Sequence, residues 1–148
     1  MRFCIDYHTV NEVTEKDAYP LPRIEDNLDS LKGAQWFSTL DLASGFWQME
    51  MEEEDKAKTA FCMYGSFQFN VMPFGLCNAP RTFERLMETV LRGMQWERAV
   101  LYLDDPIIFS ATLEEHMQRL KEVFERLKKA NLMLKPSKCH FFRKQVEF

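Results

Sequence analysis

Two short apolar segments, separated by a polar stretch, constrain this chain most. Residues 99–101 and 107–109 are each apolar and bounded by polar residues, a pattern typical of buried strands. Between them stand Asp104 and Asp105, followed by Pro106. Because unpaired carboxylates are costly to bury, the two aspartates at a hairpin tip would project side by side into a cleft and could hold a divalent metal ion. A polar turn shaped by the proline explains the same residues without a metal.

Apolar periodicity elsewhere predicts a mixture of helices and strands. Strands are expected at 37–42, 59–61 and 67–71. Helices are expected where apolar residues recur at helical spacing and end signals flank them. The first carries Ile24, Leu28 and Leu31 and stops at Gly33; the second, with Asn78 as its N-cap, carries Phe83, Leu86, Met87, Val90 and Leu91; the third, with a Thr112/Glu115 capping box, carries Leu113, Met117, Leu120, Phe124 and Leu127. The fold class is therefore α+β.

Composition limits the class of protein. The chain has 148 residues, 46% of them hydrophobic, and no apolar run long enough to span a membrane. The N-terminus has no signal-peptide pattern, and the four widely spaced cysteines favour a reduced intracellular setting. A net charge of −4 argues weakly against nucleic-acid binding. Residues 112–148, however, hold nine Lys/Arg against five Asp/Glu, and such a basic segment could face phosphates or form a solvated helix face.

Several further motifs join the paired aspartates in a fixed order along the chain. They are residues 5–7, 19–24, 37–42, 71–80 and 138–142. Together they resemble the reverse transcriptase domain of gypsy-type long-terminal-repeat retrotransposons, and the resemblance covers nearly the whole chain. It implies a right-hand polymerase palm with part of the fingers, an antiparallel sheet packed on helices, and an RNA-directed DNA polymerase encoded in a Pol polyprotein.

The resemblance also implies an organisation into subdomains. Residues 1–35 and 56–80 would be fingers-like, and residues 36–55 and 81–148 palm-like. The thumb, connection and RNase H domains would lie outside residues 1–148. With the fingers and palm incomplete, we expect this polypeptide alone to be a weak polymerase or none.

Three aspartates match the catalytic residues of the family. They are Asp41, Asp104 and Asp105, with the backbone carbonyl of Leu42 as a further metal ligand. Nucleotide addition requires a primer 3′-hydroxyl to attack an α-phosphate in line, and two divalent ions can stabilise the attacking and leaving oxygens. Hard cations prefer oxygen ligands, so carboxylates converging from different segments suit two Mg²⁺ or Mn²⁺ ions.

Four residues match nucleotide-binding positions of the family. Phe46 would lie beneath the incoming sugar and exclude a ribose 2′-hydroxyl, although a core aromatic is the alternative. Arg2 would contact the triphosphate, as suits a cationic phosphate clamp, or would be a solvated terminal charge. Phe74 and Gly75 match the segment beside the nascent base pair, where core packing is the alternative for the phenylalanine.

Template and primer contacts are implied for four more residues. Asn78 and Pro80 resemble the template-side segment, although helix capping explains the asparagine without a template. Tyr102 and Leu103 would pack near the primer terminus, with strand packing as the alternative for the tyrosine. The implied partners are an RNA or DNA template with its primer, dNTPs and the remainder of the Pol polyprotein, with no membrane. The protein would act inside the cell, in the cytoplasm, in virus-like particles or in the nucleus.

Pro106 departs from the family pattern, which usually has Ile or Val there. Proline lacks a backbone N–H and restricts the preceding aspartate, so the aim of Asp104 could shift. Two alternatives to an active polymerase therefore stay open. One is an inert retroelement relic, or a co-opted domain that binds nucleic acid or a partner. The other is a different two-metal enzyme with a palm-like fold, such as a nuclease or cyclase.

Overall fold

The computed structural model describes residues 4–20, 23–102 and 105–146 and divides the chain into two compact units. Unit 1 consists of Met1–Tyr19 and Ser44–Phe83, and unit 2 of Pro20–Ala43 and Glu84–Phe148. These boundaries differ from the expected fingers and palm divisions at 20–35, 44–55 and 81–83, and the assignment to fingers and palm stays a prediction. None of the helices in the described residues is long and apolar enough to cross a membrane.

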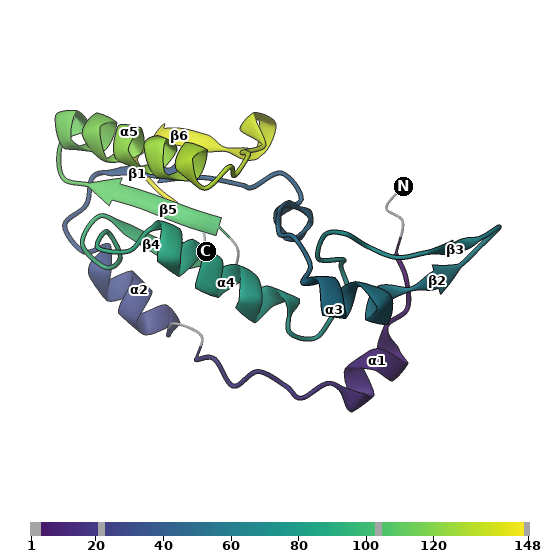
Figure 1. Cartoon of the computed structure of the whole chain (residues 1–148). Helices are drawn as coiled ribbons and strands as arrows, with labels where there is room; N and C mark the ends of the chain where they lie inside the picture. The colour runs from purple at the N-terminus through teal and green to yellow at the C-terminus, as the bar shows by residue number, and fades with distance from the viewer. Residues whose placement is uncertain (1–3, 21–22, 103–104, 147–148) are drawn as a thin grey trace. The chain divides into compact units, whose positions relative to one another are not determined.

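A four-stranded antiparallel sheet forms the centre of unit 2 (Figure 1). Its strands stand in the order β4-β5-β1-β6 and run over Ala99–Tyr102, Asp105–Ser110, Trp36–Thr39 and His140–Arg143. The two apolar segments around the paired aspartates are therefore adjacent strands, as their short β-branched pattern predicts. The strand expected at 37–42 is confirmed in its first part only, since β1 ends at Thr39.

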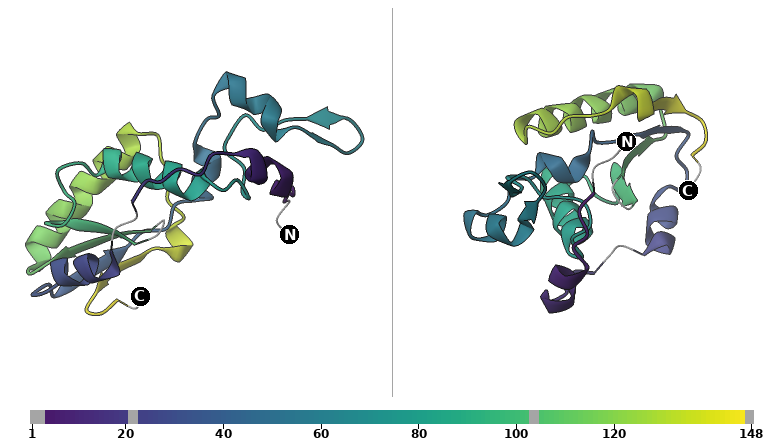
Figure 2. Two further views of the ribbon diagram at one scale, coloured as in Figure 1. Left: turned by 90° about the horizontal axis from the view of Figure 1, so that it is seen from below. Right: turned by 90° about the vertical axis from the view of Figure 1, so that its right-hand side faces the viewer.

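Helices cover both faces of this sheet (Figure 2). On one face, Leu31 follows helix α2 (Ile24–Ser30) and joins a buried cluster that also holds Phe37, Val100, Ile107 and Phe109. Gly33, at φ +82°, ends this segment as expected, because that conformation carries little penalty for glycine. Helix α5 (Leu113–Lys129) packs on β5 and β1. The strand that leads to Asp41 is thus fixed by packing on both sides.

Helix α5 begins as predicted, but its buried residues differ in part from the predicted set. The N–H of Glu115 donates to Thr112 Oγ1 at 3.3 Å, which confirms the capping box. The buried residues are His116, Leu120, Val123 and Leu127. Leu113, Met117 and Phe124, expected in the core, are 37%, 58% and 38% exposed. The prediction is confirmed for Leu120 and Leu127 and wrong for the other three. It did not include His116, which two serines of the sheet bind.

The side chain of His116 links helix α5 to strands β5 and β1 through a chain of hydrogen bonds whose directions are defined. Ser110 donates to the Thr112 carbonyl at 2.8 Å, so its oxygen accepts from His116 Nδ1–H at 3.0 Å. The other ring nitrogen, Nε2, then accepts from the Ser38 hydroxyl at 2.7 Å. This network assigns the neutral Nδ1–H tautomer. Burial, and secondly the nearby Arg119 cation, lower the pKa of His116.

Strand β6 carries a bulge that completes this network. Phe37 pairs with Arg143 and Thr39 with His140, so two residues of β6 oppose Ser38 alone. One of them, Phe142, has φ 55°, an unusual conformation for an aromatic residue. Its N–H donates to Ser38 Oγ at 3.1 Å. The bulge therefore satisfies the hydroxyl that holds His116, three residues before Asp41.

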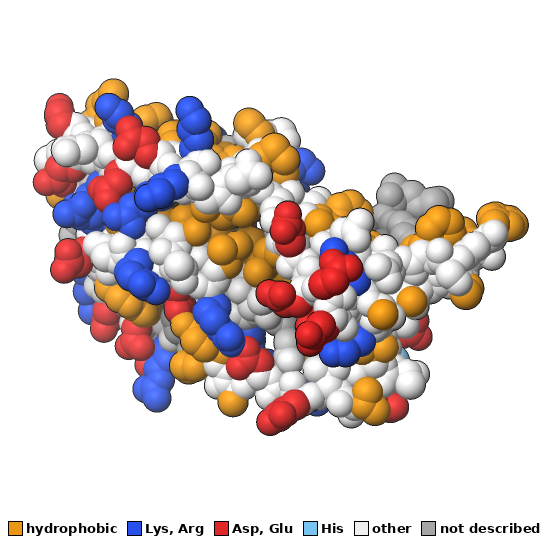
Figure 3. Space-filling model, viewed as in Figure 1, with side chains coloured by type: hydrophobic (Ala, Val, Ile, Leu, Met, Phe, Trp, Pro, Cys, Tyr) orange, Lys and Arg blue, Asp and Glu red, His pale blue; other side chains and the backbone are white. Residues whose placement is uncertain are grey.

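Unit 1 is built from short elements. They are α1 (His8–Val13), η1 (Gly45–Gln48), α3 (Glu53–Lys56), η2 (Ala57–Thr59), β2 (Phe61–Cys62) and β3 (Ser66–Phe67). The expected strands at 59–61 and 67–71 are confirmed only at Phe61 and Phe67, which pair in the short hairpin of β2 and β3; Val71 forms a single bridge with Glu50. Hydrophobic side chains stand exposed at the hairpin tip (Figure 3), where Tyr64 is fully exposed. Tyr7 is buried, which raises its pKa, and its hydroxyl donates to the Thr59 carbonyl at 3.1 Å.

Helix α4 (Ala79–Val90) begins in unit 1 and ends in unit 2. Its first turn is closed by the backbone carbonyl of Asn78, which accepts from Thr82 N–H at 3.0 Å. The Asn78 side chain instead binds residues 15–17, in place of the expected side-chain cap. Within unit 2, Arg126 of α5 donates to the carbonyls of Val90 and Arg92 and so ties the end of α4 to α5.

Candidate active site

The register of the sheet aligns Asp41 with Asp105. Strands β1 and β5 pair antiparallel from Trp36–Ser110 to Thr39–Ile107, and the N–H of Leu40 donates to the Pro106 carbonyl at 3.0 Å. Asp41 lies two residues beyond β1, and the same register extended one step past Leu40 would set it opposite Asp105. Directly opposed residues share a face of a sheet, with Cβ atoms about 4.5–5.5 Å apart. The register therefore leads us to expect these two carboxylates on one face.

The hairpin places one further site residue beside them. Tyr102 pairs with Asp105 across β4 and β5 and packs against the buried cluster of the α2 face. Asp104 and Leu103, expected as a catalytic residue and a primer contact, lie outside the described residues, as does Arg2. The third carboxylate and the expected triphosphate clamp therefore remain predictions.

Residues 133–139 surround the backbone of Asp41. The N–H of Lys135 donates to the Asp41 carbonyl at 2.8 Å, and the Asp41 N–H donates to Cys139 Sγ at 3.4 Å. Lys138, at the end of η3 (Pro136–Lys138), donates from Nζ to Asp41 Oδ2 at 3.0 Å. Sequence reasoning placed Lys138 in a family-like motif but did not predict this contact, because no local pattern relates two residues 97 positions apart.

The backbone around Leu42 leaves its carbonyl turned away from the neighbouring segment. Leu42 forms an antiparallel bridge with Leu134, and the two flanking hydrogen bonds use the carbonyls of Asp41 and Met133. In such a bridge the polar groups of the bridged residue point outward. This arrangement is compatible with the expected role of the Leu42 carbonyl as a metal ligand.

The donor set fits a hard divalent cation. Asp41 and Asp105 would supply carboxylate oxygens and Leu42 a carbonyl oxygen, which are the ligands that Mg²⁺ and Mn²⁺ prefer. Among the residues that the structure describes, no group of three or more His, Cys, Asp or Glu side chains forms a metal cluster. Asp104, the third expected ligand, stands outside those residues.

Pro106 removes one hydrogen bond directly beside this pair of aspartates. It is fully buried in the central strand β5, a position where proline is unusual. In an antiparallel ladder, opposed residues exchange two bonds, and here only the bond from Leu40 N–H to the Pro106 carbonyl forms. The Leu40 carbonyl, which leads into Asp41, receives no bond from proline.

In unit 1, the expected nucleotide-binding aromatics lie together. The rings of Phe46 and Phe74 are 5.3 Å apart, and Phe46 also packs edge-on against Phe83 at 5.6 Å. A Cβ atom on Gly45 would lie 2.7 Å from Phe83 Cζ, so the backbone and the ring are in close contact. Phe46 is half-buried rather than enclosed, and the packing of these rings supports either a sugar-facing platform or a small aromatic core.

The segment that contains Gly75 and Asn78 is held by side-chain amides. Asn11 donates to the Gly75 carbonyl and accepts from Cys77 N–H, each at 2.8 Å. Gly75 has φ +99°, which glycine adopts readily. Asn78 donates to the Glu15 carbonyl and accepts from Asp17 N–H, so its amide braces residues 15–17. Pro80 is exposed in the first turn of α4, where proline is tolerated.

Comparison with known proteins decides the family. The family model described as reverse transcriptase (RNA-dependent DNA polymerase) matches residues 1–148. The chain belongs to the reverse transcriptase family. The Pol polyprotein of the Drosophila melanogaster transposon 297 is 46% identical over 99% of this chain, and that of transposon opus is 43% identical over the same share. Both transposons are gypsy-type, as the motif order predicts.

Solved structures agree with this membership. A foamy viral protease-reverse transcriptase in complex with double-stranded DNA matches 99% of this chain with a TM-score of 0.89 and 26% identity. The same viral protein in complex with an RNA/DNA hybrid matches 97% of the chain with a TM-score of 0.86. These matches cover 26% and 19% of the viral chains. The expected polymerase-like α+β fold is therefore confirmed.

The chain covers very different shares of its relatives. It spans 14% and 15% of the two Drosophila polyproteins. It spans 95% of an RNA-directed DNA polymerase homolog from Oenothera berteroana, which is 46% identical over 84% of the chain. Family membership favours a polymerase over another two-metal enzyme, such as a nuclease or cyclase.

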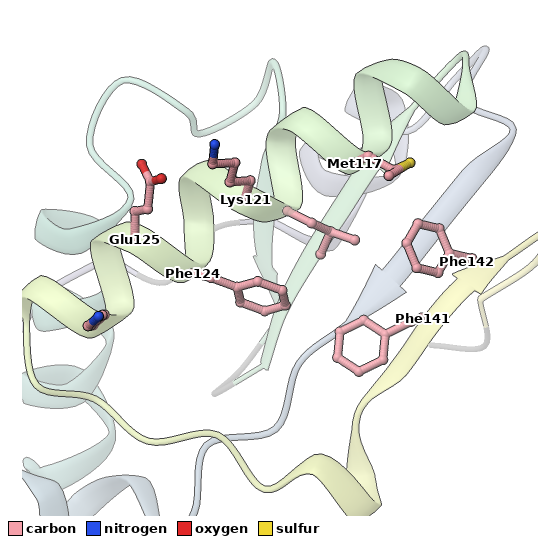
Figure 4. Close-up of a pocket in the computed structure, with 8 residues that line it drawn as sticks. Met117, Lys121, Phe124, Glu125, Phe141 and Phe142 are labelled. Carbon is pink, nitrogen blue, oxygen red and sulfur yellow. The ribbon is translucent and has the colours of Figure 1, made fainter.

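Two hollows of this reverse transcriptase chain do not contain the expected catalytic residues. A cavity of about 800 Å³ in unit 1 is lined partly by Asn78 but also by Glu50, Glu52 and Asp55, whose charge would repel a phosphodiester. An apolar groove of about 510 Å³ lies between α5 and β6 in unit 2. Figure 4 shows Phe124 directed toward Phe141 across it, and their ring centroids are 6.1 Å apart.

Proposed function

We propose that this chain is the catalytic part of an RNA-directed DNA polymerase that adds dNTPs to a primer 3′-hydroxyl. The observation that carries the proposal is the pairing of β1 with β5 in a member of the reverse transcriptase family, since this register, extended beyond Leu40, would bring Asp41 and Asp105 to one face of the sheet. Asp104 completes the set as the third carboxylate. The family depends on divalent metal ions.

Each residue of unit 2 has a distinct role in the proposal. Asp41 and Asp104 would hold two Mg²⁺ or Mn²⁺ ions, with the Leu42 carbonyl oxygen as a further ligand, and Asp105 would add negative potential. Bound ions of this kind stabilise charge on the attacking and leaving oxygens of phosphoryl transfer. The protein fixes the orientation of these ligands through the paired strands and through packing on both faces of the sheet. Tyr102 and Leu103 support the primer terminus.

Residues of unit 1 handle the nucleotide and template. Phe46 presents its ring to the sugar and excludes a 2′-hydroxyl, and its contact with Phe74 holds that ring in place. Gly75 lets the backbone approach the nascent base pair, and Arg2 binds the triphosphate. Asn78 and Pro80 line the template side.

The partners follow from the same assignment. They are an RNA or DNA template with its primer, dNTPs, and the other segments of a Pol polyprotein. The foamy viral relatives were solved with double-stranded DNA and with an RNA/DNA hybrid. We place the protein inside the cell, in the cytoplasm, in virus-like particles or in the nucleus. The four free cysteines are consistent with a reducing compartment.

A primer-extension assay tests the proposal. The chain is fused to the flanking segments of a related Pol polyprotein and given a primed RNA template, dNTPs and Mg²⁺ or Mn²⁺. We expect incorporation that Asp104→Asn abolishes. A folded fusion without incorporation would favour an inert relic, for which buried Pro106 is the specific structural argument.

A further inference from the structure

Lys138 places a positive charge on the Asp41 carboxylate. Its Nζ lies 3.0 Å from Asp41 Oδ2. The aspartate side chain is 21% exposed and the lysine 57%, so water screens the pair only in part. The lysine ammonium and a divalent metal ion would compete for the same carboxylate oxygens, because the two cations repel each other at close range.

The backbone holds the two partners in place. Lys135 N–H donates to the Asp41 carbonyl, and the Asp41 N–H donates to Cys139 Sγ, so both backbone groups of the aspartate are bound by one segment. Within that segment, Lys138 N–H donates to the Lys135 carbonyl at 2.9 Å and closes the turn. The lysine therefore starts from a fixed point beside Asp41, which lowers the entropic cost of the ion pair.

We propose that Lys138 is the counter-ion that neutralises and orients the Asp41 carboxylate while no metal ion is bound, and that its ammonium leaves the carboxylate when an ion binds. Lys138 is thus a positioning residue that acts through Asp41. The inference rests on the proposed metal site and adds the competitor that occupies it beforehand.

The first arm of the test is a double-mutant cycle on the metal-free chain. Urea unfolding is measured for the unaltered chain, Lys138→Met, Asp41→Asn and the double variant, with EDTA present. Partly exposed ion pairs couple weakly, so we expect Lys138→Met to lower the folded-to-unfolded ratio roughly two- to fivefold, and to have little effect once Asp41 is Asn. Equal effects in both backgrounds would overturn the inference.

The second arm measures Mn²⁺ affinity by water-proton relaxation, which detects weak binding. Removing the competitor should tighten Mn²⁺ binding by roughly two- to fivefold in Lys138→Met, while Lys138→Arg stays close to the unaltered chain. Lys135→Met is the matched control, because it removes a nearby exposed charge and keeps the backbone bond to Asp41. A gain no larger than in this control, weaker binding, or no Mn²⁺ binding by any variant would overturn the inference.

The two arms separate this inference from the proposed function. If the chain shows the Lys138 coupling and the Mn²⁺ effect but the folded fusion incorporates no dNTP, the polymerase proposal alone is refuted. A fusion that polymerises DNA while its Lys138→Met variant matches the Lys135→Met control would refute the counter-ion alone.

Discussion

His116 should make the stability of the four-stranded sheet fall in mild acid. Its ring is fully buried between Ser38 and Ser110, and burial lowers its pKa below the ordinary value of 6.5. Above pH 6.5 the ring is neutral in both the folded and the unfolded chain, so it adds no pH dependence. As pH falls below 6.5, only the unfolded chain takes up the proton, and the folded state loses stability until pH reaches the lowered pKa.

The magnitude follows from proton linkage. One group that stays neutral in the fold and is protonated in the unfolded chain costs up to about 1.4 kcal/mol of unfolding free energy per pH unit. His116→Gln keeps a polar side chain without a titrating group. It should cost about 1–3 kcal/mol at pH 8, because hydrogen bonds of the network are lost or misaligned, and the difference from the unaltered chain should shrink as pH falls.

Urea unfolding at several pH values from 8.0 to 5.5, followed by circular dichroism and by the fluorescence of the tryptophans, measures this difference. Trp36 lies in β1 and reports on the sheet. His140→Gln is the matched control, since it makes the same substitution at an exposed imidazole. Parallel loss of stability in the unaltered chain and His116→Gln over this range would refute the reasoning.

Three substitutions test other contacts. Pro106→Ile restores a hydrogen-bond donor to the Leu40 carbonyl, which should stabilise the fold by about 0.5–1.5 kcal/mol. It also raises the conformational entropy of the unfolded chain, which costs about 0.4–1 kcal/mol, so the free energy of unfolding should change little. Polymerisation by the fusion should rise, and equal polymerisation rates for the two versions would contradict this. Phe46→Val should raise ribonucleotide incorporation relative to deoxyribonucleotide incorporation by roughly 10–200-fold, and an unchanged ratio would assign that ring to packing alone. Gly45→Ala should destabilise the chain by about 1–3 kcal/mol through its clash with Phe83, and a midpoint of urea unfolding equal to that of the unaltered chain would show that the ring can move.

Local sequence signals predicted the parts of the fold that local physics decides. The hairpin strands around Asp105 and the capping box at Thr112 follow from short apolar runs and from one side-chain hydrogen bond. The strand expected at 67–71 is confirmed only at Phe67, because its aromatics pack within unit 1 on one another. Phe61 lies 5.7 Å from Phe67 and 5.6 Å from Phe69, and the alternating pattern reflects that small cluster rather than a sheet face.

Long-range partners explain what the sequence left out. Lys138 and Asp41 are 97 residues apart, and His116 and Ser38 are 78 apart, so neither pair has a local pattern. A buried histidine also breaks the apolar periodicity that located the core face of α5. The alignment of Asp41 with Asp105 could be expected only through the family resemblance, and the strand register now gives it a geometric basis.

The proposed metal site at Asp41 is best tested by locating a bound Mn²⁺ ion. In nitrogen-15 NMR spectra of the chain, paramagnetic Mn²⁺ broadens amide signals near the ion. The signals of Asp41, Leu42 and Asp105 should disappear first, and Asp41→Asn should preserve them at the same Mn²⁺ concentration. Broadening centred on the acidic first turn of α3, with the signals around Asp41 unaffected, would contradict the proposed metal site.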